Sequence, residues 1–318
     1  MESGPQTLQE AIVYFADPQN CLNYMVAKRW PSGVTCPTCG SAEVHFLAKQ
    51  LRWECKQKHP KRQFSAKVGT IFEDSPIGLD KWLSAVWMVT SMKNGVSSWE
   101  IHRSLGVTQK TAWFMLHRIR LGLQTTGGKL SGEVEVDETY IGGKARNMHK
   151  GRKKRVLEGR GGGVAGKVGV QGALQRGGEI RVNVIRDSKR GTLIDNIDAN
   201  VERGSHVFTD ELQAYFGLQA DYAHDVINHA ECYAVDNIHT NGLENFWSLM
   251  KRHLRGTYVC VEPFHLFRYM DEQAFRFNTR RSMTEAERFD KAVSQVVGKR
   301  LTYAELTGKN QPEAETRF

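Results

Sequence analysis

Four residues of types that bind metal ions occur as two close pairs in the first fifth of this 318-residue chain. They are Cys36, Cys39, Cys55 and His59. Soft ligands in two such pairs suit one tetrahedral Zn²⁺ ion. The segments 43–47 and 51–54 between them have the pattern of short strands that form a hairpin. We therefore predict a zinc ribbon over residues 31–68, since a thioredoxin-like redox pair would need a strand–helix–strand context that is missing here.

The charge balance favours a polyanionic partner. The chain has 44 Lys and Arg against 35 Asp and Glu, a net charge of +9 and a pI near 9.2. Nucleic acid is the simplest such partner, although net charge alone does not distinguish a DNA-binding protein from a merely basic one. No apolar run approaches the ~18 residues of a membrane span, and the polar amino terminus lacks a signal-peptide core. We expect no membrane partner and a cytoplasmic protein of bacterial type, associated with the nucleoid when bound to DNA.

Residues 76–125 have the pattern of a helix-turn-helix segment. Ser97 and Glu100 have the spacing of a capping box at the start of one helix, and Gly106 provides a tight turn before the next. Helix, short glycine turn and polar-fronted helix are typical of DNA binding, although a plain helical connector has the same pattern. The expected DNA contacts are Thr108, Gln109, Lys110 and Arg118.

The second half of the chain changes to a strand-rich pattern. We predict strands at 133–141, 164–174, 179–185, 206–209 and 222–227, with helices at 188–201 and 211–216. Three successive strands followed by alternating helices and strands are the order of an RNase H-like fold. The predicted fold class is therefore α/β (α+β overall): an RNase H-like catalytic domain preceded by a zinc ribbon and a helix-turn-helix segment.

Three acids occupy the places where an RNase H-like fold assembles its site. Asp137 ends the apolar-alternating run 133–137, Asp210 closes the fourth strand, and Glu244 lies on a late helix. We expect both aspartates to lie at strand ends. Apolar residues of that helix recur with the helical period, and they are Leu243, Phe246, Trp247, Met250 and Leu254. Glu244 and Lys251 share the opposite face, about 10 Å apart at 1.5 Å per residue.

Carboxylates on separate elements suit metal-dependent phosphodiester chemistry. Two divalent cations, Mg²⁺ or Mn²⁺, can activate an attacking oxygen and stabilise the leaving oxygen, and such hard cations prefer oxygen ligands. Each acid alone is weak evidence, because many of the 35 acids merely solvate a surface or cap a helix. We expect Asp137, Asp210 and Glu244 to hold the ions, with Lys251 close to the phosphate.

A basic segment lies between the first two predicted strands, at 144–155. Its most concentrated charges are Arg152, Lys153, Lys154 and Arg155. A flexible solvated loop is the simpler interpretation. Beside a phosphodiester-cutting site, however, such a run would bind phosphates through charge and counterion release, and we expect it to become ordered on DNA.

Several long blocks, in order, resemble one family. They are residues 29–31 and 36–40, 69–76, 110–120, 136–143, 209–211 and 239–247, followed by Lys251 and Arg252. With these blocks the chain resembles insertion-sequence DDE transposases that carry an amino-terminal zinc ribbon, the ISXO-type group. The resemblance covers most of the chain.

The resemblance implies a transposase that binds the terminal inverted repeats of its element, cuts at their ends and joins the 3′ hydroxyls to target DNA. Asp137 and Asp210 match the family's metal ligands. Members of the group carry Glu, Asn or His at the third position; we choose Glu244, and Asn241 one turn earlier remains the alternative. Arg252 is expected to contact DNA. Because transposition acts on two ends, we expect a homodimer or a larger synaptic complex.

The expected organisation is a helical segment, the ribbon, the helix-turn-helix segment, the catalytic domain and a helical extension with a tail. Their boundaries are 1–30, 31–68, 76–125, 131–280 and 281–318. Two other functions stay open at this point: a zinc-ribbon and helix-turn-helix DNA-binding protein with an inert catalytic domain, and an RNase H-like nuclease without strand transfer.

Overall fold

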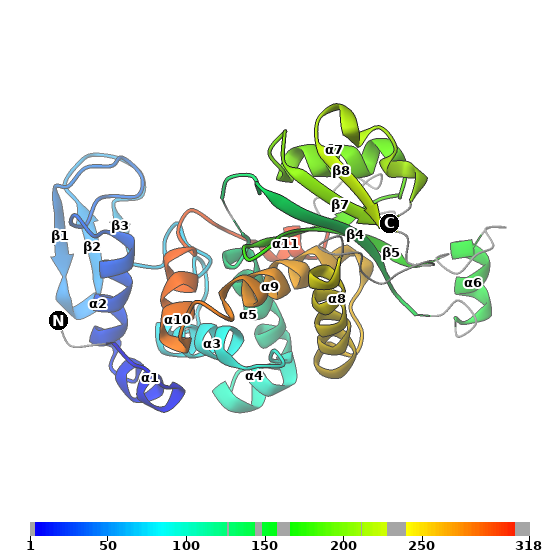
Figure 1. Cartoon of the computed structure of the whole chain (residues 1–318). Coiled ribbons are helices and arrows are strands. Elements are labelled where there is room, and N and C mark those ends of the chain that lie inside the picture. Colours follow the sequence, from blue (N-terminus) through cyan, green and yellow to red (C-terminus); the bar gives the residue numbers. More distant parts are fainter. Residues whose placement is uncertain are drawn as a thin grey trace. The chain divides into compact units, whose positions relative to one another are not determined.

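The chain divides into two compact units, which are described separately (Figure 1). The computed structural model describes residues 4–125, 127–143, 148–157, 166–210, 212–227 and 240–308. Unit 1 contains Met1–Gln124 and Thr279–Pro312, and unit 2 contains Thr125–Asn278 and Glu313–Phe318. Residues near the carboxyl terminus therefore fold together with the amino-terminal part. None of the helices in the described ranges has the length and apolarity needed to cross a membrane.

Unit 1 is built around one buried helix. Its helices are α1 (Leu8–Phe15), α2 (Pro18–Arg29), α3 (Leu79–Ser91), α4 (Ser98–Leu105), α5 (Gln109–Gly122), α10 (Glu285–Ser294) and α11 (Tyr303–Leu306). Trp87 of α3 is fully buried and packs against Phe289 of α10, with ring centroids 4.7 Å apart. Phe15 of α1 lies 5.7 Å from the same Phe289 ring. The carboxyl-terminal helix α10 thus completes a core that α1 and α3 begin.

Helices α4 and α5 form the predicted helix–turn–helix pair. The capping box of Ser97 and Glu100 is present at the start of α4, which confirms that prediction. Gly106 ends α4 with a φ of 61°, a left-handed conformation that favours glycine. Thr108 then begins α5, and its side chain accepts a hydrogen bond from the backbone N–H of Thr111. Local capping residues therefore set the length and direction of this turn.

The ribbon in unit 1 is a three-stranded antiparallel sheet in the order β1–β2–β3. Its strands are β1 (Val44–Leu47), β2 (Arg52–Cys55) and β3 (Gln63–Phe64). The hairpin of β1 and β2 confirms the predicted strands to within one residue. Strand β3 was not predicted, because two residues are too short to show an alternating pattern.

Unit 2 has one five-stranded sheet with helices on both faces. Its strands are β4 (Glu133–Ile141), β5 (Val168–Gln175), β6 (Ile180–Ile185), β7 (His206–Asp210) and β8 (Ala223–Ile227), and its helices are α6 (Lys150–Leu157), α7 (Arg190–Asn200), α8 (Asn241–His253) and α9 (Leu266–Thr279). The strand order is β6–β5–β4–β7–β8. β5 runs antiparallel to β4 and β6, whereas β4, β7 and β8 are parallel. This is the predicted RNase H-like arrangement.

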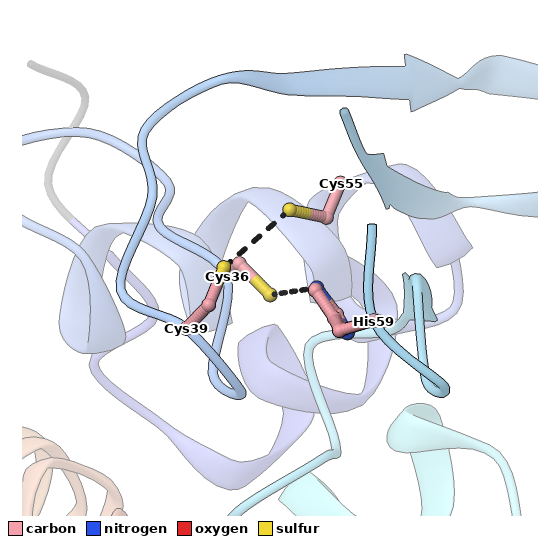
Figure 2. Close-up of side chains that lie close together, drawn as sticks. All are labelled: Cys36, Cys39, Cys55 and His59. Carbon is pink, nitrogen blue, oxygen red and sulfur yellow. Dashed lines mark hydrogen bonds between the residues drawn. The ribbon is translucent and has the colours of Figure 1, made fainter. Parts of the chain in front are cut away.

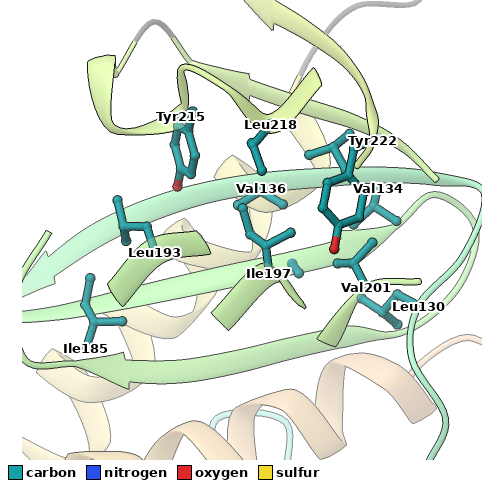
Figure 3. Close-up of a cluster of buried hydrophobic side chains, with 12 residues drawn as sticks. Leu130, Val134, Val136, Ile185, Leu193, Ile197, Val201, Tyr215, Leu218 and Tyr222 are labelled. Atoms are coloured by element: carbon teal, nitrogen blue, oxygen red, sulfur yellow. The ribbon is translucent and has the colours of Figure 1, made fainter. Parts of the chain in front are cut away.

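The two faces of the sheet have separate apolar cores. Val134 and Val136 of β4 join the cluster under α7, which also contains Leu193 and Ile197 (Figure 3). The other cluster lies under α8 and α9. The predicted apolar stripe of α8 is buried there, with Leu243, Phe246, Trp247, Met250 and Leu254 all at most 7% exposed. Burial of this stripe leaves the polar face of α8 turned away from the core.

The basic segment differs from the sequence prediction. We expected a loop throughout 144–155, but α6 begins at Lys150. Lysine and arginine have high helix propensity. The sequence prediction gave more weight to the charge of the segment and to its flanking glycines, and therefore missed the helix. Residues 144–147 lie outside the described ranges. The short helix predicted at 211–216 is a 3₁₀ turn, η3 (Gln213–Tyr215).

Candidate active site and metal centre

The two ligand pairs of the ribbon converge in unit 1. Cys36, Cys39, Cys55 and His59 offer ligand atoms that all lie within 4.8 Å of one another (Figure 2). Cys39 Sγ is 3.6 Å from Cys55 Sγ, and Cys36 Sγ is 3.4 Å from His59 Nε2. Ligand atoms about 2.0–2.3 Å from a tetrahedral zinc ion are separated by roughly 3.3–3.8 Å. The four side chains therefore fit one zinc ion, with histidine in the fourth place.

The Cys36 thiol ionises more readily than an ordinary cysteine. Although burial alone raises the pKa of the Cys36 thiol, the backbone N–H groups of Cys39 and Thr38 and the adjacent thiols lower it to about 6. Burial raises the pKa of the Cys55 thiol. Zinc binds the thiolate form, so a bound ion would release the protons and offset the repulsion between buried sulfur atoms.

Asp210 ends β7, as predicted, whereas Asp137 lies in the middle of β4, which continues to Ile141. Both acids follow the part of β4 and β7 that pairs in parallel. The pairing of β4 with β7 ends at Glu135 and Phe208, two residues before each acid. Carboxyl ends of parallel strands are where open sheets of this kind form their sites. One carboxylate oxygen from each of Asp137, Glu138 and Asp210 lies within 4.8 Å of the others. We call these three residues the acidic cluster.

Glu138 is the member of the acidic cluster that the sequence did not predict. Successive strand residues point to opposite faces, so the residue after Asp137 is assigned to the other side of the sheet. Asp137 lies on the α8 side, where Trp247 Nε1 donates to its Oδ2 at 2.8 Å. Glu138 lies on the α7 side, where the Tyr215 hydroxyl donates to its Oε1. Two adjacent acids within the first predicted strand were the signal available for it.

Burial and mutual repulsion make two of these carboxyl groups unusually hard to ionise. Burial raises the pKa of Asp137 to about 6, and the charge of Asp210 adds to the rise while the Trp247 hydrogen bond opposes it. Burial raises the pKa of Glu138 to about 8 despite the Tyr215 hydrogen bond. Like charges held together in this way favour a bound divalent cation, for which carboxylates are suitable ligands.

Helix α8 carries the other predicted catalytic residues near Asp137. Glu244 and Asn241 are exposed in its first turn, and Lys251 is half-buried two turns later. The charge of Glu244 raises the pKa of Asp137. Burial lowers the pKa of Lys251, and the charge of Asp137 opposes this effect. Glu244 and Lys251 are thus within electrostatic reach of Asp137, but Glu244 is not part of the acidic cluster in the described residues.

Close packing fixes α8 against the strand that carries Asp137. The backbone N–H of Leu243 donates to the buried Glu135 Oε2 at 3.1 Å. Gly172 of β5 pairs with Asp137, and a Cβ atom at Gly172 would lie 2.9 Å from both Leu243 and Trp247. Only the absence of a side chain at this position allows the helix to approach and the indole to reach Asp137.

The start of α5 carries three of the predicted DNA contacts. Thr108 and Lys110 are exposed, and Gln109 is half-buried. The Gln109 amide donates to Ser98 Oγ at 2.9 Å, which connects α5 to α4. The Lys110 ammonium lies 4.9 Å from the centre of the Tyr303 ring. Thr108 and Lys110 are therefore accessible although each also has a contact within unit 1, and Gln109 is the least exposed of the three.

Arg118 has a different place from the one expected. It is only 4% exposed. Its Nε donates to Leu301 O at 3.0 Å, and its Nη1 donates to Glu73 O at 2.8 Å. These bonds connect α5 to two other segments of unit 1. The structure therefore gives Arg118 a structural role in place of the predicted DNA contact, because its guanidinium is buried and used by backbone carbonyls.

The remaining predicted DNA contacts belong to unit 2. Lys153 and Lys154 of α6 and Arg252 of α8 are exposed. The backbone of Arg152 and Arg155 lies in α6, and their side chains lie outside the described part of the structure. The described cations are therefore accessible to a polyanion.

Comparisons with known proteins agree with this architecture. The ISXO2-like transposase domain matches residues 129–278, and the transposase zinc-ribbon domain matches residues 17–57. The first match covers the sheet, the acidic cluster and α8. The second covers three of the four zinc-type ligands, and His59 follows two residues beyond its end.

Two relatives are similar over most of their own length. An uncharacterized protein in transposable element ISH50 of Halobacterium salinarum is 28% identical over 251 residues, which are 76% of this chain and 84% of the relative. An uncharacterized transposase-like protein of Haemophilus influenzae is 32% identical over 96 residues, covering 30% of this chain and 77% of the relative.

A solved simian T-cell lymphotropic virus intasome in complex with PP2A regulatory subunit B56 gamma matches at 14% identity and a TM-score of 0.28. That match covers 59% of this chain and 64% of the solved one. With its zinc-ribbon and catalytic-domain matches and its transposase relatives, the chain belongs to the ISXO2-like transposases of insertion sequences.

Proposed function

We propose that this protein is an active DNA transposase that binds the terminal inverted repeats of its element, cuts at their ends and joins the ends to target DNA. The observation that carries the proposal is the position of Asp137 and Asp210. They meet just beyond the parallel pairing of β4 and β7, with carboxylate oxygens within 4.8 Å, in a domain of the transposase family. The relative from transposable element ISH50 supports the link to a mobile element.

Asp137 and Asp210, with Glu244 of α8, would hold divalent cations, Mg²⁺ or Mn²⁺, in two positions. When bound, such ions activate an attacking oxygen and stabilise the leaving oxygen of a phosphodiester. Water first attacks the phosphorus at the element end, and the bond to the 3′ oxygen breaks to give a 3′ hydroxyl. That hydroxyl then attacks a target phosphorus, and the target's own 3′ oxygen leaves. Each step exchanges one P–O bond for another.

The residues of the chain orient these reactions. Trp247 fixes the Asp137 carboxylate through its indole N–H at 2.8 Å. We assign Glu244 as the third catalytic residue, because a carboxylate binds a hard cation better than the Asn241 amide and its charge reaches Asp137. Lys251 lies within electrostatic reach of the same acid. Its ammonium would bind the phosphate that reacts.

DNA would be bound at two kinds of surface. In unit 1, the exposed Thr108 and Lys110 precede or begin α5, with Gln109 beside them. In unit 2, the basic helix α6 and Arg252 provide positive charge, and the phosphates would bind there with release of counterions. Lys153 and Lys154 belong to this second surface, and we propose Arg152 and Arg155 of the same helix as further contacts, as the sequence suggests. Arg118 is left out of the proposal because its guanidinium is buried.

The zinc ribbon would contain one structural Zn²⁺ ion held by Cys36, Cys39, Cys55 and His59. With four protein ligands the ion has no open position for a substrate. We also propose that the protein acts as a homodimer or larger synaptic complex, because two element ends must be joined, and that it works in the cytoplasm on nucleoid DNA.

Cleavage and joining of labelled DNA that contains the repeats flanking the gene test the proposal. With Mg²⁺ or Mn²⁺ we expect nicked ends and strand-transfer products from the wild type. Asp137→Asn and Asp210→Asn should each lower the rate by about 10³-fold, because loss of a metal ligand removes several kcal/mol of transition-state stabilisation at about 1.36 kcal/mol per tenfold. DNA binding should persist in both variants. Cleavage without joining would indicate a nuclease, and binding without either reaction would indicate an inert DNA-binding protein.

A further inference from the structure

Tyr215 is a buried polar residue next to the acidic cluster that the proposed mechanism does not use. It lies in η3, five residues after Asp210, and is fully buried. Its hydroxyl donates to Glu138 Oε1. A buried tyrosine hydroxyl needs a hydrogen-bond partner. Here the partner is a half-buried carboxylate that the charges of Asp210 and Asp137 repel, and the hydrogen bond from Tyr215 stabilises its ionised form.

A second buried side chain orients the Tyr215 hydroxyl. Gln171 is 4% exposed and lies opposite Glu138 in the β4–β5 register. Its Nε2 donates to Tyr215 Oη at 3.2 Å and to Leu193 O at 3.3 Å. Because the amide N–H occupies a lone pair of the tyrosine oxygen, the O–H itself is left to point at Glu138. The three residues form one directed chain from β5 through η3 to β4.

We infer that Tyr215, oriented by Gln171, is a positioning residue that holds the Glu138 carboxylate toward Asp210 so that Glu138 joins in binding the divalent cation. The inference rests on the proposed function. A carboxylate can accept the tyrosine hydrogen bond through one oxygen and bind a cation through the other. Partners of this kind orient metal ligands, and their loss typically weakens metal binding by about 10–100-fold.

The structure offers a matched control in the same apolar cluster. Tyr222 is also buried, and its hydroxyl donates to a carboxylate, Asp198 Oδ1, at 2.7 Å. Both tyrosines belong to the core under α7 (Figure 3). Asp198 lies on α7 and is not part of the acidic cluster. Tyr222→Phe therefore removes a similar buried hydrogen bond without touching the site.

The test is Mn²⁺ binding by calorimetry to the zinc-loaded full chain without DNA. Tyr215→Phe should raise the dissociation constant by about 10-fold, and Gln171→Leu should produce a smaller shift in the same direction. Tyr222→Phe should bind Mn²⁺ like the wild type, with a comparable loss of thermal stability. In a Glu138→Gln background, Tyr215→Phe should add less than about 2-fold, because residues that act through one another are not additive.

The inference would be overturned if Tyr215→Phe bound Mn²⁺ with wild-type affinity, or if Tyr222→Phe lost as much Mn²⁺ affinity as Tyr215→Phe. It would also be overturned if the effects of Tyr215→Phe and Glu138→Gln on Mn²⁺ affinity were fully additive, or if the wild type bound no Mn²⁺ at the acidic cluster. Cleavage assays separate this from the proposed function. A wild type that binds Mn²⁺ with the expected variant pattern but cuts no DNA would contradict the transposase activity and leave the role of Tyr215 standing.

Discussion

The zinc-type site of unit 1 and the acidic cluster of unit 2 differ in whether the chain supplies a complete set of ligands for a metal ion. The ribbon ligands come as two local pairs and supply four soft donors at tetrahedral spacing. The three acids come from strands β4 and β7, which are far apart in the sequence. Burial raises the pKa of Asp137 and Glu138. A closed donor set suits a structural ion, whereas an open group of repelling carboxylates suits ions that also bind substrate.

Removal of the ribbon ion should have the largest effect. The wild type should contain about one zinc ion per chain. Cys36→Ser should lose this ion and its ribbon should unfold, because structural zinc contributes about 10–16 kcal/mol of apparent binding energy in small domains. Metal analysis and limited proteolysis measure this. Cys260→Ser, at an exposed cysteine, is the control. A Cys36→Ser protein with a folded, metal-free ribbon would remove the contrast between the two centres.

The third catalytic position should produce the next largest effect. Glu244→Gln should slow Mg²⁺-dependent cleavage by about 10³-fold, since it removes a metal ligand worth several kcal/mol. Asn241→Ala should stay within about tenfold of the wild type if the amide is only auxiliary. Asn245→Ala, exposed on the same helix, controls for effects of the surface. Normal joining by Glu244→Gln together with loss in Asn241→Ala would transfer the role to Asn241.

Gly172 tests whether close packing of α8 supports the acidic cluster. Gly172→Ala places a Cβ atom 2.9 Å from Leu243 and Trp247, so we expect a loss of about 1–3 kcal/mol of stability from overpacking and slower cleavage. Gly191→Ala is the control, because nothing lies within 4 Å of a Cβ there and alanine favours its helix α7. Equal melting temperatures of the two variants would show that the contact at Gly172 is not tight.

The pH dependence of the metal-free protein tests the raised pKa values of the acidic cluster. The pKa of Glu138 rises from 4.5 to about 8 and that of Asp137 from 3.8 to about 6. The folded state therefore binds more protons than the unfolded state between these values, and its stability falls as the pH rises from about 4 to about 8. Thermal unfolding at pH 5 and pH 8 measures this. Mn²⁺ should restore stability at pH 8, and Glu138→Gln should flatten the dependence. A melting temperature that rises across this range would contradict the raised pKa values.

Features with local or periodic causes were predictable from the sequence. The stripe of α8 follows from the spacing of Leu243, Phe246 and Trp247, and the turn between α4 and α5 from its capping residues. The zinc-type ligands were found because pairs close in sequence are close in space. Asp210 could be assigned to a strand end because it follows a short apolar run, but the same reasoning was wrong for Asp137, since β4 continues to Ile141.

Features that depend on tertiary contacts were not predictable. Glu138 was missed because strand alternation assigns it to the face opposite Asp137, and only the position of Asp210 brings all three acids together. Arg118 looks like a surface cation in the sequence, but Leu301 and Glu73 bury it. Gly172 gives no sign that α8 lies against it. In each case the deciding partner is distant in the chain.

The most direct measurement is an anomalous diffraction map of a crystal soaked in Mn²⁺, recorded at the zinc and manganese edges. We predict a zinc peak among Cys36, Cys39, Cys55 and His59, and a manganese peak in contact with Asp137 and Asp210. The same map would show whether Glu138 or Glu244 completes the manganese site. Manganese absent from Asp137 and Asp210, or bound at another group of acids, would contradict the assignment of the acidic cluster as the catalytic centre.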